Sequence, residues 1–147
     1  MSKQDQAGLI LKLYELRREE VMRAGRDWYF REFHPESMQD VMGATMGPHS
    51  GHMRMVASYW DMAAALVNHG AIDIELFNDT NGEHFGVFAK VELFLEEIRS
   101  TIGAPYFMKN LEKLIDATPG GRERCVAVRE RMKAMREKLA AQKAATE

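Results

Sequence analysis

Cysteine and proline are scarce in this chain, and long apolar runs are missing from it. Cys125 is the single cysteine among 147 residues, which excludes an internal disulfide and a cysteine-based zinc cage within one chain. No apolar run approaches the roughly 18 to 20 residues that span a bilayer, and the opening residues lack the apolar core of a signal peptide. We therefore expect a cytoplasmic protein without a membrane partner.

The chain also lacks a large excess of charge of either sign, because 20 basic and 22 acidic side chains leave a net charge of −2. The charges are spread unevenly: residues 33–119 carry 5 basic and 12 acidic side chains, whereas residues 120–147 carry 8 and 4. A content of 46% hydrophobic and 29% charged residues is typical of a globular chain. At this length we expect a single helical domain over residues 1–147.

Apolar residues recur at helical spacing, and no segment sustains the alternation that is typical of a strand. This pattern predicts an all-α fold, a compact helical bundle of about four longer helices and three short ones. The longer helices are expected at residues 4–33, 51–69, 81–102 and 121–143, and the short ones near residues 36–42, 73–78 and 105–117. A frayed C-terminal tail is expected over about residues 140–147.

The helix predicted at residues 51–69 is the most informative segment. Apolar side chains cover most of its circumference and leave one polar stripe of about 80°. We therefore expect this helix to be central and covered on several sides. If the stripe faces inward it lines a ligand pocket, and if it faces water it is an ordinary solvated stripe. The candidate pocket residues are Arg54, Ser58, Tyr59, Trp60 and Asp61.

Three histidines are candidate metal ligands, although no metal site is assigned. His49 and His52 lie near the start of the helix at residues 51–69, and His84 lies near the start of the helix at residues 81–102. Imidazole and carboxylate groups together suit several transition metals. A HExxH motif and paired ExxH motifs are both missing. We therefore expect no cofactor.

The predicted C-terminal helix carries eight basic residues, a composition that is also found in nucleic-acid-binding segments. Glu123, Glu130 and Glu137 interrupt this basic run, and no aromatic residue is interleaved for base stacking. An exposed helix face is the favoured interpretation, and a nucleic-acid partner is not expected.

Residues 59–99 resemble a bacterial all-helical domain family of unknown function. The run YWDMAAALVNHGAIDIELF over residues 59–77 is followed by a helix at residues 88–99 that ends in Glu96-Glu97-Ile98-Arg99. In that family a helix ends in a glycine, a short Ile-Asp-x-x-Leu helix follows, and a later helix ends in an arginine. The resemblance implies a helical fold and supplies no activity.

The leading functional hypothesis is a helical protein-interaction or scaffold module that self-associates, for example as a homodimer, or binds another protein. Two apolar seams support it, one over residues 88–102 and one over residues 125–139, together with the opposite charge of the middle and the tail. No catalytic residue is recognised, and an enzyme is less favoured. The first alternative is a small-molecule-binding or metal-binding protein, with or without enzymatic activity, that uses the polar stripe and the nearby histidines. The second alternative is a nucleic-acid-binding accessory protein that acts through the basic helix.

Overall fold

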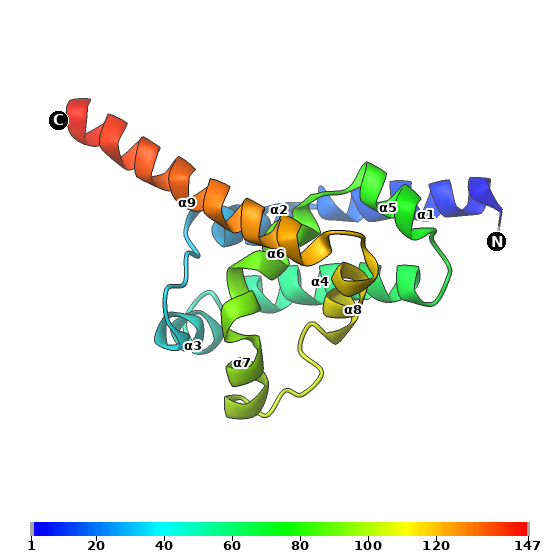
Figure 1. The fold of residues 1–147 in the computed structure, drawn as a ribbon, viewed down its shortest axis with the longest axis horizontal. Helices are drawn as coiled ribbons and strands as arrows, with labels where there is room; N and C mark the ends of the chain where they lie inside the picture. The colour runs from blue at the N-terminus through cyan, green and yellow to red at the C-terminus, as the bar shows by residue number, and fades with distance from the viewer. Residues whose placement is uncertain (1, 147) are drawn as a thin grey trace.

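A computed structural model describes residues 2–146, and within this range the chain forms helices and no strand. The all-α prediction is confirmed. The elements are α1 (Lys3–Arg17), α2 (Glu20–Arg31), α3 (Met38–Met46), α4 (Ser50–Asn68), α5 (Ile74–Thr80), α6 (Glu83–Val91), the 3-10 helix η1 (Glu92–Phe94), α7 (Leu95–Thr101), α8 (Lys109–Ala117) and α9 (Gly121–Thr146). Figure 1 shows their arrangement.

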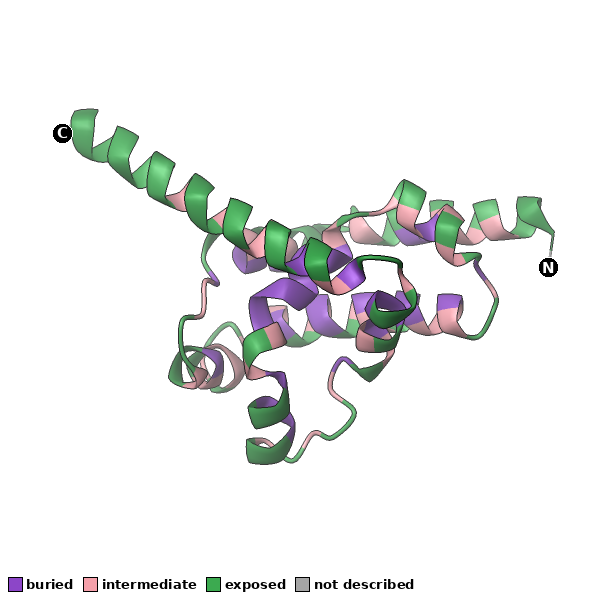
Figure 2. Cartoon of the chain, in the orientation of Figure 1, coloured by how far each residue is buried: buried purple, intermediate pink, exposed green. Residues whose placement is uncertain are grey.

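α4 lies at the centre of the fold, as its wide apolar arc predicts. It packs against α2, α3 and α8, and it also touches α5 and α6. Trp60 is only 1% exposed, and Ala63 and Ala64 are fully buried. The small alanine side chains allow neighbouring helices to approach closely. Buried residues follow α4 and α6 through the middle of the molecule in Figure 2.

The single helix predicted at residues 4–33 is two helices, α1 and α2. The chain breaks at Glu19, whose backbone is extended and whose carboxylate accepts a hydrogen bond from the Met22 N–H at 3.1 Å. Glu19 therefore caps the N-terminus of α2. The prediction of one continuous helix over residues 4–33 is therefore wrong.

The helix predicted at residues 81–102 is divided into α6, η1 and α7, and α7 turns away from α6 in Figure 1. The apolar seam of this segment survives the division, because Phe88, Val91, Leu95 and Ile98 are all buried. At the break, the Glu92 carboxylate receives hydrogen bonds from two arginines of α9. The predicted helix is therefore divided where Glu92 contacts α9, and the spacing of apolar residues around Glu92 does not predict this contact.

Three other helix ends differ from the predicted ones. α3 continues to Met46, past the predicted end near residue 42. α8 begins at Lys109 rather than near residue 105, and the residue before it, Met108, has a left-handed backbone with φ 54°. α9 is helical through Thr146, past residue 140 where fraying is predicted. Residue 147, the end of that predicted tail, lies outside the described residues.

α9 packs against α6 and α8. Gly121 and Cys125 are its buried residues, and the helix then extends past the body of the molecule (Figures 1 and 2). No helix in the described range combines the length and apolar character needed to cross a membrane. We call the buried start of α9, around Gly121 and Cys125, its base. We call the part of α9 after Met132, which is mostly exposed, its arm.

Candidate functional site

Part of the polar stripe of α4 connects this helix to α8 through hydrogen bonds. Asp61 Oδ1 accepts a hydrogen bond from the Leu111 N–H at 2.9 Å, and its Oδ2 accepts one from Asn110 Nδ2 at 3.0 Å. About two turns further along α4, Asn68 Nδ2 donates to the Asn110 carbonyl oxygen at 2.9 Å. Asp61 thus satisfies the Leu111 backbone donor in the first turn of α8, a helix whose N-cap residue, Met108, makes no side-chain cap hydrogen bond. This part of the stripe holds α8 against α4.

The rest of the stripe borders a groove that is open to solvent. Arg54 and Ser58 are exposed, and the groove has a volume of about 550 Å³ between α4 and residues 104–108. Ala57 and Met108 contribute to its mainly apolar wall. Within residues 2–146, no ion pair forms at the Arg54 guanidinium. Arg54, Ser58 and Asp61 therefore line a surface groove rather than an internal pocket.

Tyr59 and Trp60 point away from this groove. The Tyr59 hydroxyl donates to the Leu13 carbonyl oxygen, and Trp60 Nε1 donates to Glu83 Oε2 at 3.2 Å. Glu83 also receives the Arg26 guanidinium, with contacts as short as 2.8 Å. These bonds join α4 to α1, α6 and α2. The five candidate residues of α4 are consequently not brought together at one site.

The histidines fall into two separate environments. The rings of His49 and His52 lie 5.8 Å apart and stack on Trp28. His84 is fully buried, and its Nε2 lies 2.9 Å from Asn78 Oδ1. Burial lowers the pKa of His84 to about 3, so the ring is neutral at ordinary pH. Over the described part of the chain, no group of three or more His, Cys, Asp or Glu side chains is placed to hold a metal ion.

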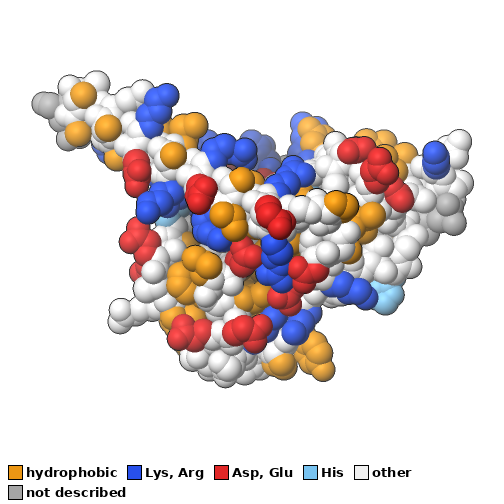
Figure 3. Space-filling view, in the orientation of Figure 1, with side chains coloured by type: hydrophobic (Ala, Val, Ile, Leu, Met, Phe, Trp, Pro, Cys, Tyr) orange, Lys and Arg blue, Asp and Glu red, His pale blue; other side chains and the backbone are white. Residues whose placement is uncertain are grey.

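A network of charged side chains attaches the base of α9 to the body. Glu92 is central to it, because Oε2 accepts from Arg122 Nη1 at 3.1 Å and Oε1 accepts from Arg129 Nη1 at 2.9 Å. Alternating acidic and basic groups are visible beneath α9 in Figure 3. Two of the eight basic residues of α9 are thus committed to ion pairs. The network consists of Glu92, Arg99, Glu112, Asp116, Arg122 and Arg129.

The apolar seam of α9 continues beyond the body. Cys125 is buried and Met132 is half-buried, but Met135 is 53% exposed and Leu139 is 58% exposed. These four residues share one face of the helix by their spacing. Between this face and Phe30 of α2 lies an open groove of about 530 Å³. Within residues 2–146, the last part of the seam is therefore left uncovered.

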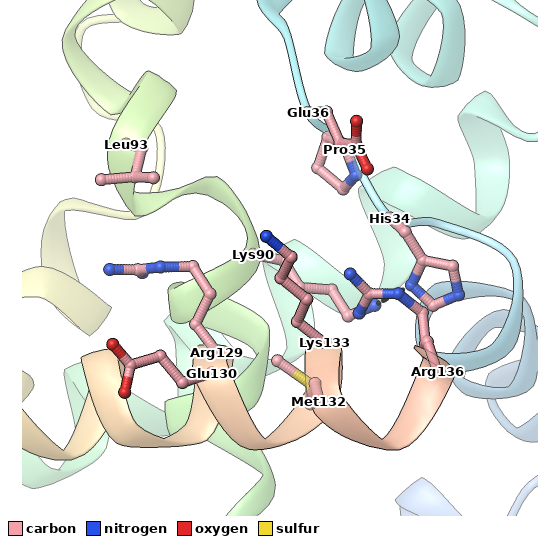
Figure 4. Close-up of a pocket in the computed structure, with 10 residues that line it drawn as sticks. All are labelled: His34, Pro35, Glu36, Lys90, Leu93, Arg129, Glu130, Met132, Lys133 and Arg136. Atoms are coloured by element: carbon pink, nitrogen blue, oxygen red, sulfur yellow. Dashed lines mark hydrogen bonds between the residues drawn. The ribbon is translucent and has the colours of Figure 1, made fainter. Parts of the chain in front are cut away.

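A cationic cleft lies beside this groove, between α6, the end of α2 and α9 (Figure 4). Its volume is about 440 Å³, and Lys90, Lys133, Arg136 and His34 contribute to its lining. Lys90 is only 6% exposed, and its Nζ donates to the Phe33 carbonyl oxygen at 2.5 Å. Burial, with a contribution from the Arg136 charge, lowers the pKa of Lys90 to about 7.

Sequence reasoning missed Lys90, although a signal is present. It is the only charged residue in the run Phe85–Val91, every member of which is buried. A lysine inside such a run must either reach water or find internal partners. Lys90 does the second, since it bonds a backbone oxygen and lies 3.0 Å from His34 Nδ1.

A family model described as a domain of unknown function (DUF4760) matches residues 4–118, which is well over half of the chain. The chain belongs to the DUF4760 family. The expected membership of a helical family of unknown function is confirmed, while a bacterial origin stays a prediction. Searches among curated proteins and among solved structures found no match.

The DUF4760 match ends just before α9. His34 and Lys90 lie inside the matched residues, whereas Lys133, Arg136 and the exposed end of the seam lie after them. The cleft and the adjoining groove are therefore built jointly by the DUF4760 segment and by the helix that follows it.

Proposed function

We propose that this DUF4760 protein is a self-associating helical interaction module that acts in the cytoplasm. Its contact element is the arm of α9, and its partner is a second copy of the same chain. The observation that carries this proposal is the exposed end of the apolar seam, Met135 and Leu139, which continues the face that α9 buries at its base. Burial of apolar surface is the main favourable term in association.

The other seam of the chain is not available for this role. Its residues between Phe88 and Ile98 are buried within the chain's own core. The groove between Phe30 and the α9 arm, in contrast, is open and lined by Met132, Met135 and Leu139. In a two-fold symmetric dimer each arm would lie in the groove of the other copy, so that the same patch is used twice.

The charge distribution supports a second copy as the partner. The exposed arm carries basic side chains, among them Lys138 and Lys143, whereas residues 33–119 hold a surplus of acidic ones. Glu96 and Glu97 are exposed members of that surplus on α7. A basic arm and an acidic body attract each other between copies, and this attraction weakens as salt screens it.

Sedimentation equilibrium over a wide range of protein concentrations tests the proposal. The wild type should form a dimer, and Leu139→Glu should dissociate it by placing a charge in the seam. Ala141→Glu is the matched control, since Ala141 is exposed and lies about 200° around the helix from Leu139. A wild type that stays monomeric throughout, or an equal effect of both variants, would contradict the proposal.

Small-molecule binding at the groove beside Arg54 is a second candidate function. The groove volume of about 550 Å³ lies within the range of roughly 300 to 1,000 Å³ that is usual for ligand sites. An apolar wall with an unpaired guanidinium at its edge suits a small carboxylate with an apolar body. Thermal shift against a panel of aromatic and aliphatic carboxylates tests this function. A shift that survives in Arg54→Gln would exclude the groove as the binding site.

A further inference from the structure

The cationic cleft contains a buried ammonium group without an anionic partner. Lys90 Nζ bonds the Phe33 carbonyl oxygen at 2.5 Å and lies 3.0 Å from His34 Nδ1, and neither partner carries a negative charge. The rings of Tyr29 and Phe30 lie 5.8 Å and 5.6 Å from the same nitrogen. Burying a charge among neutral groups is costly unless an opposite charge accompanies it.

Two further cations line the same cleft from α9. Lys133 and Arg136 are neighbours on one face of that helix, and Figure 4 shows both side chains extending from α9 toward the cleft. In the part of the chain that the structure describes, neither side chain forms an ion pair. Burial lowers the pKa of both Lys90 and His34, and the positive charge of Arg136 contributes to the lowering of each.

The acidic side chains of the cleft do not compensate these cations. Glu36 and Glu130 belong to the lining, yet no ion pair joins either of them to Lys90 within residues 2–146. The fourth cation of the lining, Arg129, is already paired with Glu92 at 2.9 Å. Three cations are therefore left to act on the interior of the cleft.

We propose that this cleft binds a small phosphate-bearing anion through Lys90, Lys133 and Arg136. A phosphate group carries up to two negative charges and several acceptor oxygens, so it suits a cleft lined by three cations better than a single carboxylate does. The volume of about 440 Å³ accommodates the group together with a modest organic substituent. The cleft adjoins the groove of the proposed dimer contact and shares His34, Met132 and Arg136 with it, whereas Lys90 and Lys133 line the cleft alone.

The recessed position of Lys90 favours a small ligand over a nucleic acid. Its side chain is 94% covered, which follows from the 6% that is exposed. A free phosphate or a phosphate monoester can enter the cleft and meet the ammonium group, whereas a phosphate held in a duplex backbone reaches only the outer cations. Oligonucleotide binding is therefore an outcome that the experiment must distinguish.

Calorimetric titration of the full chain with inorganic phosphate, pyrophosphate and phenyl phosphate, at matched ionic strength, tests the proposal. The double variant K133Q/R136Q should weaken binding by about tenfold or more, because two charge-assisted contacts are lost. Lys138→Gln is the matched control: it removes one exposed charge from α9 outside the cleft and should leave the dissociation constant unchanged.

A second measurement reads Lys90 directly. Nitrogen-15 NMR of the lysine side chains should show its pKa rising when phosphate is added, since a bound anion stabilises the ammonium form. The monomeric variant Leu139→Glu should bind phosphate as the wild type does, which separates this proposal from self-association. The proposal is overturned by absent phosphate binding, by equal binding in K133Q/R136Q and Lys138→Gln, or by an oligonucleotide that binds more tightly than every small phosphate.

Discussion

The buried Lys90 predicts that the folded protein becomes more stable as pH rises from 7 to about 8.5. Its pKa is about 7 in the folded chain and 10.5 when the side chain is free in the unfolded chain. Between these values the unfolded state binds more protons than the folded state. Stability therefore increases with pH in this window, and the penalty of burying the ammonium group is fully present below pH 7.

The size of the effect follows from the two pKa values. Far from either value, one proton of difference changes the free energy of unfolding by about 1.4 kcal/mol per pH unit. Because Lys90 is half-protonated at pH 7 in the folded state, the gain between pH 7 and 8.5 is about 1.5 to 2 kcal/mol. Above pH 9 the gain is opposed by Cys125, whose pKa is raised by burial from 9.0 to about 12.

Urea unfolding in phosphate-free buffers at several pH values measures this profile. Lys90→Met should flatten the rise between pH 7 and 8.5, because it removes the titrating group and keeps an apolar stem in place. Cys125→Ala should keep the rise and extend it to higher pH. A wild-type free energy of unfolding that is level or falls across this window would refute the reasoning, and so would the same slope in Lys90→Met.

The other predictions concern the core, α8 and the start of α9. The pKa of His84 is about 3 in the folded chain and 6.5 when the side chain is free. The free energy of unfolding should therefore fall by up to about 4 to 5 kcal/mol as pH drops through this window. His84→Gln should remove this pH dependence in urea unfolding at acid pH. Asp61→Ala should lower the free energy of unfolding by about 1 to 2 kcal/mol, because it removes the acceptor for the Leu111 N–H in the first turn of α8. Asp61→Asn should lower it by less. Equal stability of Asp61→Ala and the wild type would contradict the capping role. Gly121→Ala should destabilise by more than about 2 kcal/mol in thermal unfolding, since its Cβ would lie 2.1 Å from the Ile115 carbonyl oxygen. Gly8→Ala, which meets nothing within 4 Å, should be neutral or stabilising, and equal losses in both glycine variants would argue against the close contact.

The spacing of apolar residues in the sequence predicts most of the helices, because the residues that recur at helical spacing are the ones that the fold buries. α4 is central for the reason that its sequence indicates: a helix that is apolar on most sides needs several neighbours. The short helix α5 is likewise capped by Asp73, whose carboxylate accepts from the Leu76 N–H at 3.0 Å. Such caps involve residues three apart, so a sequence shows them directly.

The division of the predicted helix at Glu92 and the contact of Asp61 with α8 involve residues far apart in the sequence, and local spacing does not reveal them. Asp61 bonds residues that lie 49 and 50 positions further along the chain. Glu92 meets arginines 30 and 37 positions away. The cationic cleft was missed for the same reason, since Lys90 and Arg136 become neighbours only when α9 folds across α6. Side-chain type predicts what a residue is able to bind, and the fold decides which partner it meets.

α9 is attached to the body at Glu92, close to its N-terminal end, so a small rotation there moves the far end of the helix by a larger distance. Arg122 and Arg129 hold one carboxylate from two points about 10 Å apart along the helix axis, whereas about 25 Å of helix extends from Arg129 to Thr146. A small shift of either arginine against Glu92 is consequently magnified more than twofold at the far end. The direction in which the arm points, and hence the geometry of whatever it touches, depends in part on a glutamate far from the contact itself.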